Sequence, residues 1–152
     1  MFPFVTKGIY AKDELHLPNR IISSELKNNG ETSDSWLKFK VANYIDVHNN
    51  YGAITNLKTF NNKLFFFQDN AVGVASVNDR VLITDNNMAE LTLGTGQILS
   101  RFDYVSITNG SSIVKDNSIV ASDSGLYWYD FNKNSICVLT NGVQELSKTK
   151  KV

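Results

Sequence analysis

The chain has 152 residues, with 15 basic and 15 acidic side chains and a sequence pI near 6.7. One domain is the default at this length. The balanced charge lacks the basic footprint of nucleic-acid-binding proteins and the acidic bias of disordered tails, so we expect no direct nucleic-acid recognition. No apolar stretch approaches the roughly 18 residues that a membrane span needs, and the first residues lack signal-peptide architecture. The sequence therefore predicts no membrane segment and synthesis in a cytoplasm.

The composition favours strands. Aromatic residues reach 11%, only two prolines occur, and asparagines cluster in pairs such as Asn61-Asn62 and Asn86-Asn87. Asparagine tolerates left-handed backbone angles and closes turns through its own side chain, so such pairs are typical of the turns between short strands. The single cysteine, Cys137, lies in the apolar run SICVLT and excludes an internal disulfide. The sequence predicts an all-β fold with a buried, inert thiol.

Taken in chain order, the first ambiguous stretch is residues 36–47, which fits a helix or two strands, and we expect strands. From residue 55 onward, short apolar or alternating runs are separated by turn signals every 8–12 residues. Asn109-Gly110 predicts a tight hairpin, and Gly94-Thr95-Gly96 predicts a turn rather than a phosphate-binding loop. The expected strands are residues 63–68, 72–77, 80–84, 90–93, 102–107, 112–114, 118–121, 126–131 and 135–140.

A faint internal repeat aligns residues 61–69 (NNKLFFFQD) with residues 115–123 (KDNSIVASD) at an offset of 54. Each unit has a polar turn, an apolar strand, a turn with an aspartate and a second strand. Hairpins of this kind build β-propeller blades, in which four strands take about 40–50 residues. We therefore expect antiparallel hairpins arranged as about three blades of a partial β-propeller-like array, with repeat units at residues 12–55, 56–108 and 109–145.

The run ASDSGLYWYDF carries the spacing of an Asp-box, a hairpin turn of sugar-handling β-propellers, at Asp123, Gly125 and Trp128. In that motif the carboxylate caps the turn and the tryptophan packs between sheets, so both tasks are structural. The match is partial, because Ala121 and Tyr127 stand where the motif has small hydroxyl residues. In the first unit of the repeat, Asp69 aligns with Asp123, and Asp69 with the glycine that follows it, Gly73, forms the partner turn.

No catalytic or metal-binding constellation stands out. The three arginines, Arg20, Arg80 and Arg101, match in number those that hold a sialidase substrate, but such a site needs a closed ring of blades. His16 and His48 lack partners at metal-ligand spacing, and the Asp-Asn turns lack the alternating calcium-loop pattern. We expect no enzyme activity, no metal and no cofactor.

Several segments together resemble a known family. They are residues 12–25 (KDELHLPNRIISSE), 34–36 (DSW), 54–80, 93–112 and 124–142. They resemble the propeller-type tail proteins of short-tailed bacteriophages, often called tail or head–tail stabilisation proteins, and particularly those of crAss-like phages of gut bacteria. The positions that carry the resemblance are Asn19-Arg20-Ile21, Ser24-Glu25, Trp36, Ile54-Thr55-Asn56-Leu57 and residues 60–64.

The resemblance implies a structural protein of the virion tail, at the portal-distal end that joins or seals the DNA exit channel. It implies other tail and portal proteins as partners, together with self-association. The family's members run to several hundred residues, so this chain corresponds to a part of such a protein or to a subunit that completes its ring with copies of itself. The partial Asp-box and the aromatic residues leave one alternative open, a carbohydrate-binding propeller or a tail-associated glycan hydrolase.

Overall fold

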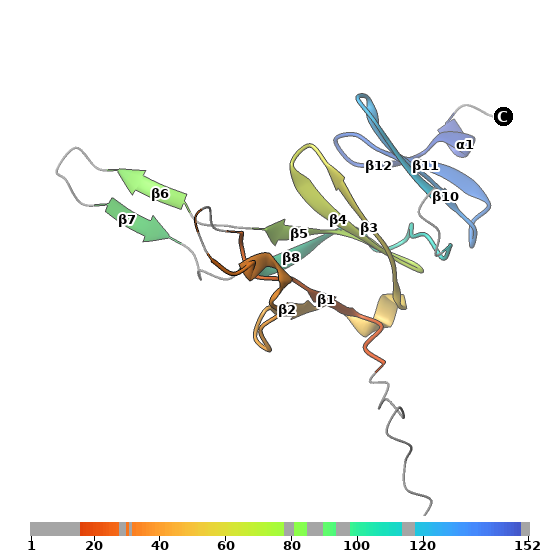
Figure 1. The fold of residues 1–152 in the computed structure, drawn as a ribbon. Coiled ribbons are helices and arrows are strands. Elements are labelled where there is room, and N and C mark those ends of the chain that lie inside the picture. Colours follow the sequence, from red (N-terminus) through yellow and green to blue (C-terminus); the bar gives the residue numbers. More distant parts are fainter. Residues whose placement is uncertain are drawn as a thin grey trace, which may run out of the picture.

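The computed structural model describes residues 16–27, 30, 32–77, 81–84, 90–93, 98–113 and 118–149. Within these ranges the chain forms four antiparallel sheets, two of four strands and two of two strands (Figure 1). Two 3-10 helices, η1 (Ser35–Leu37) and η2 (Asn49–Tyr51), and one short helix, α1 (Leu146–Thr149), are the helical elements of the described residues. The prediction of an all-β fold is confirmed.

The first two-stranded sheet pairs β1 (Arg20–Ile22) with β2 (Tyr44–Asp46). The Arg20 guanidinium donates hydrogen bonds to both carboxylate oxygens of Asp46, each at 2.7 Å, and stacks 3.7 Å from the centre of the Tyr44 ring. Ile21, on the other face of β1, is buried. The outer face of this small sheet thus carries the Arg20–Asp46 ion pair beside the exposed Ile22, and its inner face is apolar.

The first four-stranded sheet has the order β3-β4-β5-β8, with β3 (Ile54–Phe60), β4 (Lys63–Gln68), β5 (Val72–Val77) and β8 (Leu99–Ser106). Asn61 and Asn62 join β3 to β4 with φ angles of 48° and 59°, as the asparagine pair predicts for a two-residue hairpin. Between β5 and β8 the chain forms a hairpin of β6 (Val81–Thr84) and β7 (Glu90–Leu93), which extends away from the sheet (Figure 1).

The second four-stranded sheet has the order β9-β10-β11-β12, with β9 (Ile119–Ser122), β10 (Gly125–Asp130), β11 (Ser135–Leu139) and β12 (Val143–Glu145). Its strands follow one another along the chain, as in an up-and-down meander. Helix α1 follows β12 directly, and the Ser147 hydroxyl accepts a hydrogen bond from the Ile136 amide at 2.9 Å. The second sheet is therefore built from one continuous segment.

Most expected strands agree with the structure to within a few residues, but the expected hairpin at Asn109-Gly110 and the expected strand over residues 112–114 are wrong, and the strands expected over residues 36–47 are present only in part. Asn109-Gly110 does not close a hairpin; both residues lie in a buried connector between the two four-stranded sheets, and Ser112 and Ile113 are not in a strand. In the ambiguous stretch 36–47, η1 takes the beginning and β2 the end. The expected turns at residues 78–79, 85–87, 94–96 and 115–117 lie outside the described residues, as does Arg80.

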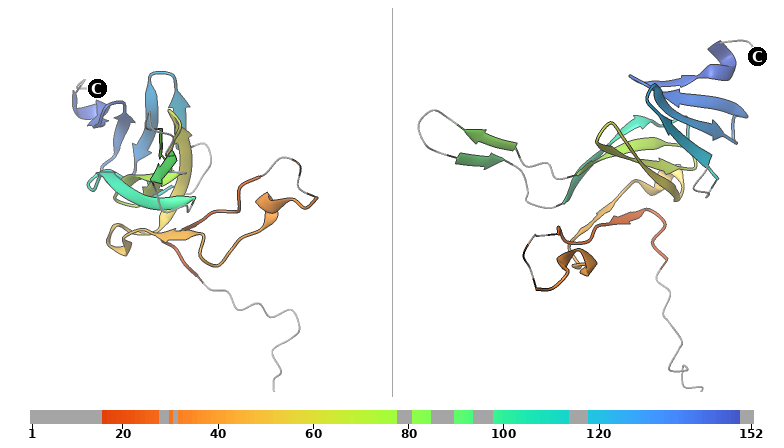
Figure 2. Two further views of the ribbon diagram at one scale, coloured as in Figure 1. Left: turned by 90° about the vertical axis from the view of Figure 1, so that its left-hand side faces the viewer. Right: turned by 45° about the horizontal axis from the view of Figure 1, so that its top comes forward.

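The sheets are stacked face to face in the order β1-β2, β3-β4-β5-β8 and β9-β10-β11-β12 (Figure 2). One core cluster joins the first two sheets; its buried members are Ile21, Val47, Phe66, Ala75 and Leu99. The other core cluster joins the two four-stranded sheets; its buried members are Phe65, Phe67, Val72, Ile119, Leu126, Trp128, Cys137 and Leu139. The middle sheet is thus buried on both faces.

The two four-stranded sheets repeat one another at an offset of 62 residues rather than 54. Phe66 and Trp128 each occupy the middle of the second strand, and each points into the core shared with the preceding sheet. Gln68 and Asp130 end these strands as buried polar residues. The offset of 54 instead pairs the second strand of one sheet with the first strand of the other. The offset of 54 comes from aligning the aspartates of two turns, and aspartate occurs in many turns. The equivalent strands are instead marked by the aromatic runs FFF and YWY.

Candidate functional site

The junction between the two four-stranded sheets is the part of the chain where most buried polar and aromatic groups meet. Trp128 lies at its centre with 2% of its surface exposed. Its ring meets the Phe67 ring edge-on, with the centroids 5.3 Å apart, and its Nε1 donates a hydrogen bond to the Gly110 carbonyl at 3.1 Å. An aromatic ring with a satisfied N–H contributes both apolar burial and orientation. Trp128 therefore fixes the second sheet to the first and to the connector.

The connector residues Asn109, Gly110 and Ser111 are buried between the sheets. The Ser111 amide donates to the Gln68 carbonyl at 2.9 Å, which ties the connector to the end of β4. A Cβ atom on Gly110 would lie 2.5 Å from the Asp69 carbonyl oxygen, so only glycine fits where the connector passes the β4–β5 turn. Close backbone approach, rather than turn geometry, explains this glycine.

Asp130 is the capping carboxylate of the junction. It is 2% exposed, and its Oδ1 accepts the amides of Asn132 and Lys133 at 3.0 and 3.2 Å, while its Oδ2 accepts the Gly110 amide at 3.4 Å. It thus closes the β10–β11 turn and holds the connector at the same time. The Asn132 side chain reaches across to the β4–β5 turn and donates to the Asp69 carbonyl at 3.2 Å.

Glu145, at the end of β12, is surrounded by the lysine side chains at this edge of the junction. Its carboxylate forms an ion pair with Lys148 at 2.6 Å and accepts hydrogen bonds from Asn109 at 2.8 Å and from Lys133 at 3.2 Å. These contacts, with Lys148 first, lower the pKa of Glu145 to about 2. The carboxylate is therefore ionised and held in place by its neighbours, a state that suits a structural anchor rather than an acid catalyst.

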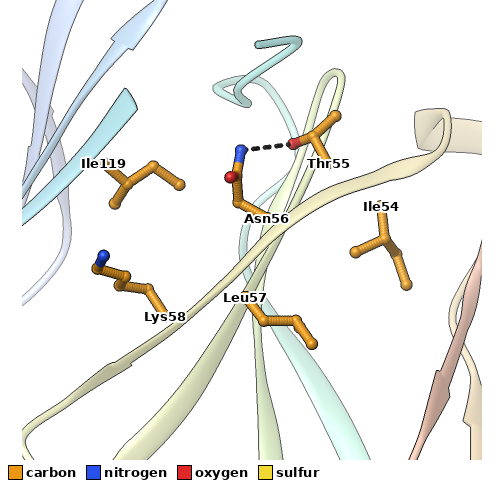
Figure 3. A pocket seen from close by; sticks show the side chains of 6 residues that line it. All are labelled: Ile54, Thr55, Asn56, Leu57, Lys58 and Ile119. Carbon is orange, nitrogen blue, oxygen red and sulfur yellow. Dashed lines mark hydrogen bonds between the residues drawn. The ribbon is translucent and has the colours of Figure 1, made fainter. Parts of the chain in front are cut away.

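An open groove of about 460 Å³ lies beside β3, where the two four-stranded sheets meet (Figure 3). Asn56 and Lys58 point from β3 toward Ile119 of the second sheet, whereas Ile54 and Leu57 lie on the other side of the strand (Figure 3). Asn56 Nδ2 donates to the Ile113 carbonyl at 2.7 Å, which fastens the end of the connector. The lining residues that the structure describes include no carboxylate.

The Asp-box-like residues lie along one hairpin of the second sheet. Asp123 is exposed in the two-residue turn between β9 and β10, and its carboxylate takes part in none of the hydrogen bonds found among the described residues. Gly125 begins β10 and is buried; a Cβ there would lie 3.0 Å from the Leu139 carbonyl oxygen. Trp128 follows in the same strand. The spacing thus brings the turn and the inter-sheet tryptophan together, while backbone capping at the junction falls to Asp130.

The repeat-partner residues, Asp69 and Gly73, lie on the first four-stranded sheet. Asp69 stands in the β4–β5 turn, where its side chain packs against Gly52 and its carbonyl accepts the Asn132 side chain. Gly73 lies inside β5 opposite Phe66, whose ring covers the space that a Cβ would need. Asp69 therefore contacts the second sheet, and Gly73 makes room for an aromatic ring.

Sequence reasoning missed Gln68, the equivalent of Asp130 on the first sheet. Its Nε2 donates to the carbonyls of His48 and Gly52 at 2.8 and 2.7 Å, and its Oε1 accepts the Tyr104 hydroxyl at 2.8 Å. The signal that could have revealed it is a polar residue directly after a run of three aromatics, in FFFQ and again in YWYD. A polar residue fully buried at a strand end needs such partners.

The described residues contain no metal-binding cluster, no membrane-spanning helix and no reactive cysteine. No three His, Cys, Asp or Glu side chains come together there in a way that could hold a metal ion. No described helix is long and apolar enough to cross a membrane. Cys137 is buried in the junction, and burial raises the pKa of its thiol, which keeps it protonated and poorly nucleophilic.

Comparisons with known proteins agree with the phage resemblance. The whole chain, residues 1–152, matches the profile of the Crassvirus muzzle protein. It is 31% identical over 132 residues to the muzzle protein of Bacteroides phage crAss001, a match that covers 87% of this chain and 10% of that protein. The chain thus spans about a tenth of the length of the relative that it matches. The expected relation to crAss-like phages is confirmed: the chain belongs to the Crassvirus muzzle protein family.

Proposed function

We propose that the chain is a structural building block of the virion tail that carries out no chemical reaction. In this proposal it forms part of the portal-distal assembly that joins or seals the DNA exit channel, with other tail and portal proteins and further copies of itself as partners. The name muzzle, shared by the family and by the crAss001 protein, fits the exit end of the tail. The sheet stack would be one part of a propeller-like array.

The observation that carries the proposal is how the polar groups at the strand ends are used. Asp130, Glu145 and Gln68 are each held by three hydrogen bonds or ion pairs within the chain, and each makes at least one contact that joins one sheet or turn to the connector or to another element. Catalytic groups instead keep a face free for substrate. Side chains whose polar atoms are bound within the chain support an architectural role.

The alternative, a carbohydrate-binding propeller or a tail-associated glycan hydrolase, draws support from the partial Asp-box and from exposed aromatic residues such as Tyr129 and Phe131. Glycoside hydrolysis needs two carboxylates about 5–10 Å apart on either side of a bound sugar. Among the described residues, those lining the groove beside β3 offer amide, hydroxyl and ammonium groups but no carboxylate. The geometry therefore favours the structural role over the hydrolase.

The experiment that tests the proposal locates the chain in the particle and assays it for glycan activity. Gold-labelled antibodies against the chain should bind the tail end of purified particles, and the purified chain should neither bind a glycan array saturably nor release reducing sugar from host capsule. Gold on the capsid shell, or saturable glycan binding, would overturn the proposal, the second result in favour of the alternative.

A further inference from the structure

The second four-stranded sheet has one face in the junction and one face open. The residues that point away from the junction alternate with the core residues Leu126, Trp128 and Cys137. We call them the outer face; its apolar and aromatic members are Val120, Tyr127, Tyr129, Ile136 and Val138. The other outward positions on β9 and β12 are Ser122 and Gln144. The outer face therefore carries no charged side chain, although a fifth of the whole chain is charged.

Several residues of the outer face are strongly exposed. Val120 is 57% exposed, Ile136 49% and Tyr129 38%, and Phe131 beside them is 61% exposed. The two tyrosine hydroxyls are bound within the sheet, since Tyr129 donates to Asn134 at 3.0 Å and Tyr127 shares a hydrogen bond with Ser124 at 3.1 Å. A contiguous neutral apolar patch on a soluble protein usually marks an interaction surface.

The first four-stranded sheet shows what covers such a face in this fold. Strand pairing makes Phe65 equivalent to Tyr127, Phe67 to Tyr129, Val72 to Ile136 and Val74 to Val138. The four residues of the first sheet face the second sheet, where Phe67 meets Trp128, Phe65 and Val72 join the same buried cluster, and Val74 packs against it. Of the equivalent four residues of the second sheet, Val138 is buried and Tyr127 half-buried, whereas Tyr129 and Ile136 are exposed, and no further sheet of the described residues lies over them.

We propose that the outer face is the docking surface for another four-stranded antiparallel sheet of the same repeat, supplied by the muzzle polypeptide itself. The covering sheet would carry a large apolar or aromatic residue in the middle of its second strand, at the position of Phe66 and Trp128, and this residue would lie against Tyr129 as Trp128 lies against Phe67. The inference rests on the repeat and not on the proposed tail function.

Chain length, charge and the existing sheet stacking favour this occupant over the others. The crAss001 muzzle protein has about nine tenths of its length outside the region matched by this chain, so the family's polypeptides are long enough to supply further sheets. A charged partner finds no complementary charge on the outer face, and a sugar finds few free hydrogen-bonding groups there. Sheets already pack face to face twice in this chain, β1-β2 on the first four-stranded sheet and the first on the second. A further sheet on the outer face would use the same kind of contact.

The direct test is a high-resolution cryo-electron microscopy map of the crAss001 muzzle protein in its particle. We expect the residues that align with Tyr127, Tyr129 and Ile136 to lie under a four-stranded sheet from elsewhere in the same polypeptide, with an apolar residue at the middle of its second strand. A face that is open to solvent, or covered by a helix, a glycan, a second copy or a different protein, would overturn the proposal.

A second test uses the chain alone. If the outer face serves docking rather than the fold of this chain, the double variant Val120→Lys, Ile136→Lys should keep its near-ultraviolet circular dichroism and melt within about 2 °C of the wild type. The matched control, Leu126→Lys on the opposite face of the same sheet, should not fold, because Leu126 is fully buried. Loss of structure in the double variant would show that the face belongs to the chain's own core and would refute a docking role.

Discussion

Replacing Trp128 by alanine removes the side chain that joins the two four-stranded sheets. An aromatic side chain buries about 150–250 Å², and at about 25 cal/mol per Å² its loss corresponds to about 4–6 kcal/mol. Measured truncations of buried aromatic residues fall at about 3–5 kcal/mol, so we take about 4 kcal/mol for Trp128→Ala. The change also leaves the buried Gly110 carbonyl without its donor. Since a domain of this kind is stable by about 5–15 kcal/mol, this single change removes a large share of the total.

The assay is urea unfolding followed by circular dichroism. With a denaturant slope of about 2 kcal/mol per molar urea, a loss of about 4 kcal/mol moves the midpoint down by about 2 M. Trp128→Phe should fall between the wild type and the alanine variant, because it keeps a ring but not the N–H. Tyr129→Ala on the outer face is the matched control and should cost less than about 1 kcal/mol. If Trp128→Ala cost no more than Tyr129→Ala, the idea that Trp128 holds the sheets together would be refuted.

Three further variants test the connector and the charges of the junction. Gly110→Ala should cost more than about 2 kcal/mol, because the new methyl group meets backbone atoms, whereas Gly142→Ala, with nothing within 4 Å of its Cβ position, should be close to neutral in the same urea assay. Asp130→Ala should lose about 2–3 kcal/mol, because three backbone amides lose their charged acceptor, and an unchanged midpoint would argue against its capping role. The lowered pKa of Glu145 means that the unfolded chain binds more protons than the native chain between about pH 4.5 and 2, so stability falls as the pH falls through this window. Urea midpoints across this range should fall less steeply for Glu145→Gln, and equal slopes for both proteins would contradict this assignment.

The strands from residue 55 onward could largely be predicted because their local signals agree with their tertiary surroundings. Residues 63–68 and 72–77 were bounded by asparagine and aspartate turns, and the structure places β4 and β5 at those positions. The aromatic run LYWYD similarly predicts β10. In these segments, turn chemistry and apolar alternation describe the same hairpins, so sequence alone is sufficient.

The connector could not be predicted, because its residues are determined by contacts with segments far away in the sequence. Asn109-Gly110 has the composition of a hairpin turn, but its glycine is needed where the backbone passes close to the β4–β5 turn, and Asn109 is held by Glu145 from 36 residues farther along the chain. The capping roles of Gln68 and Asp130 also depend on partners far away in sequence. The Asp-box spacing led to Trp128, which lies at the junction, but gave no sign of the carboxylate that caps it.

The measurement that tests the central claim most directly is the copy number of this chain in purified, DNA-filled particles, determined by quantitative mass spectrometry relative to the portal protein. A structural component of the tail is predicted to occur in a fixed whole-number ratio to the portal in every preparation. Absence of the chain from the particles, or a ratio that varies between preparations, would contradict a structural role in the virion.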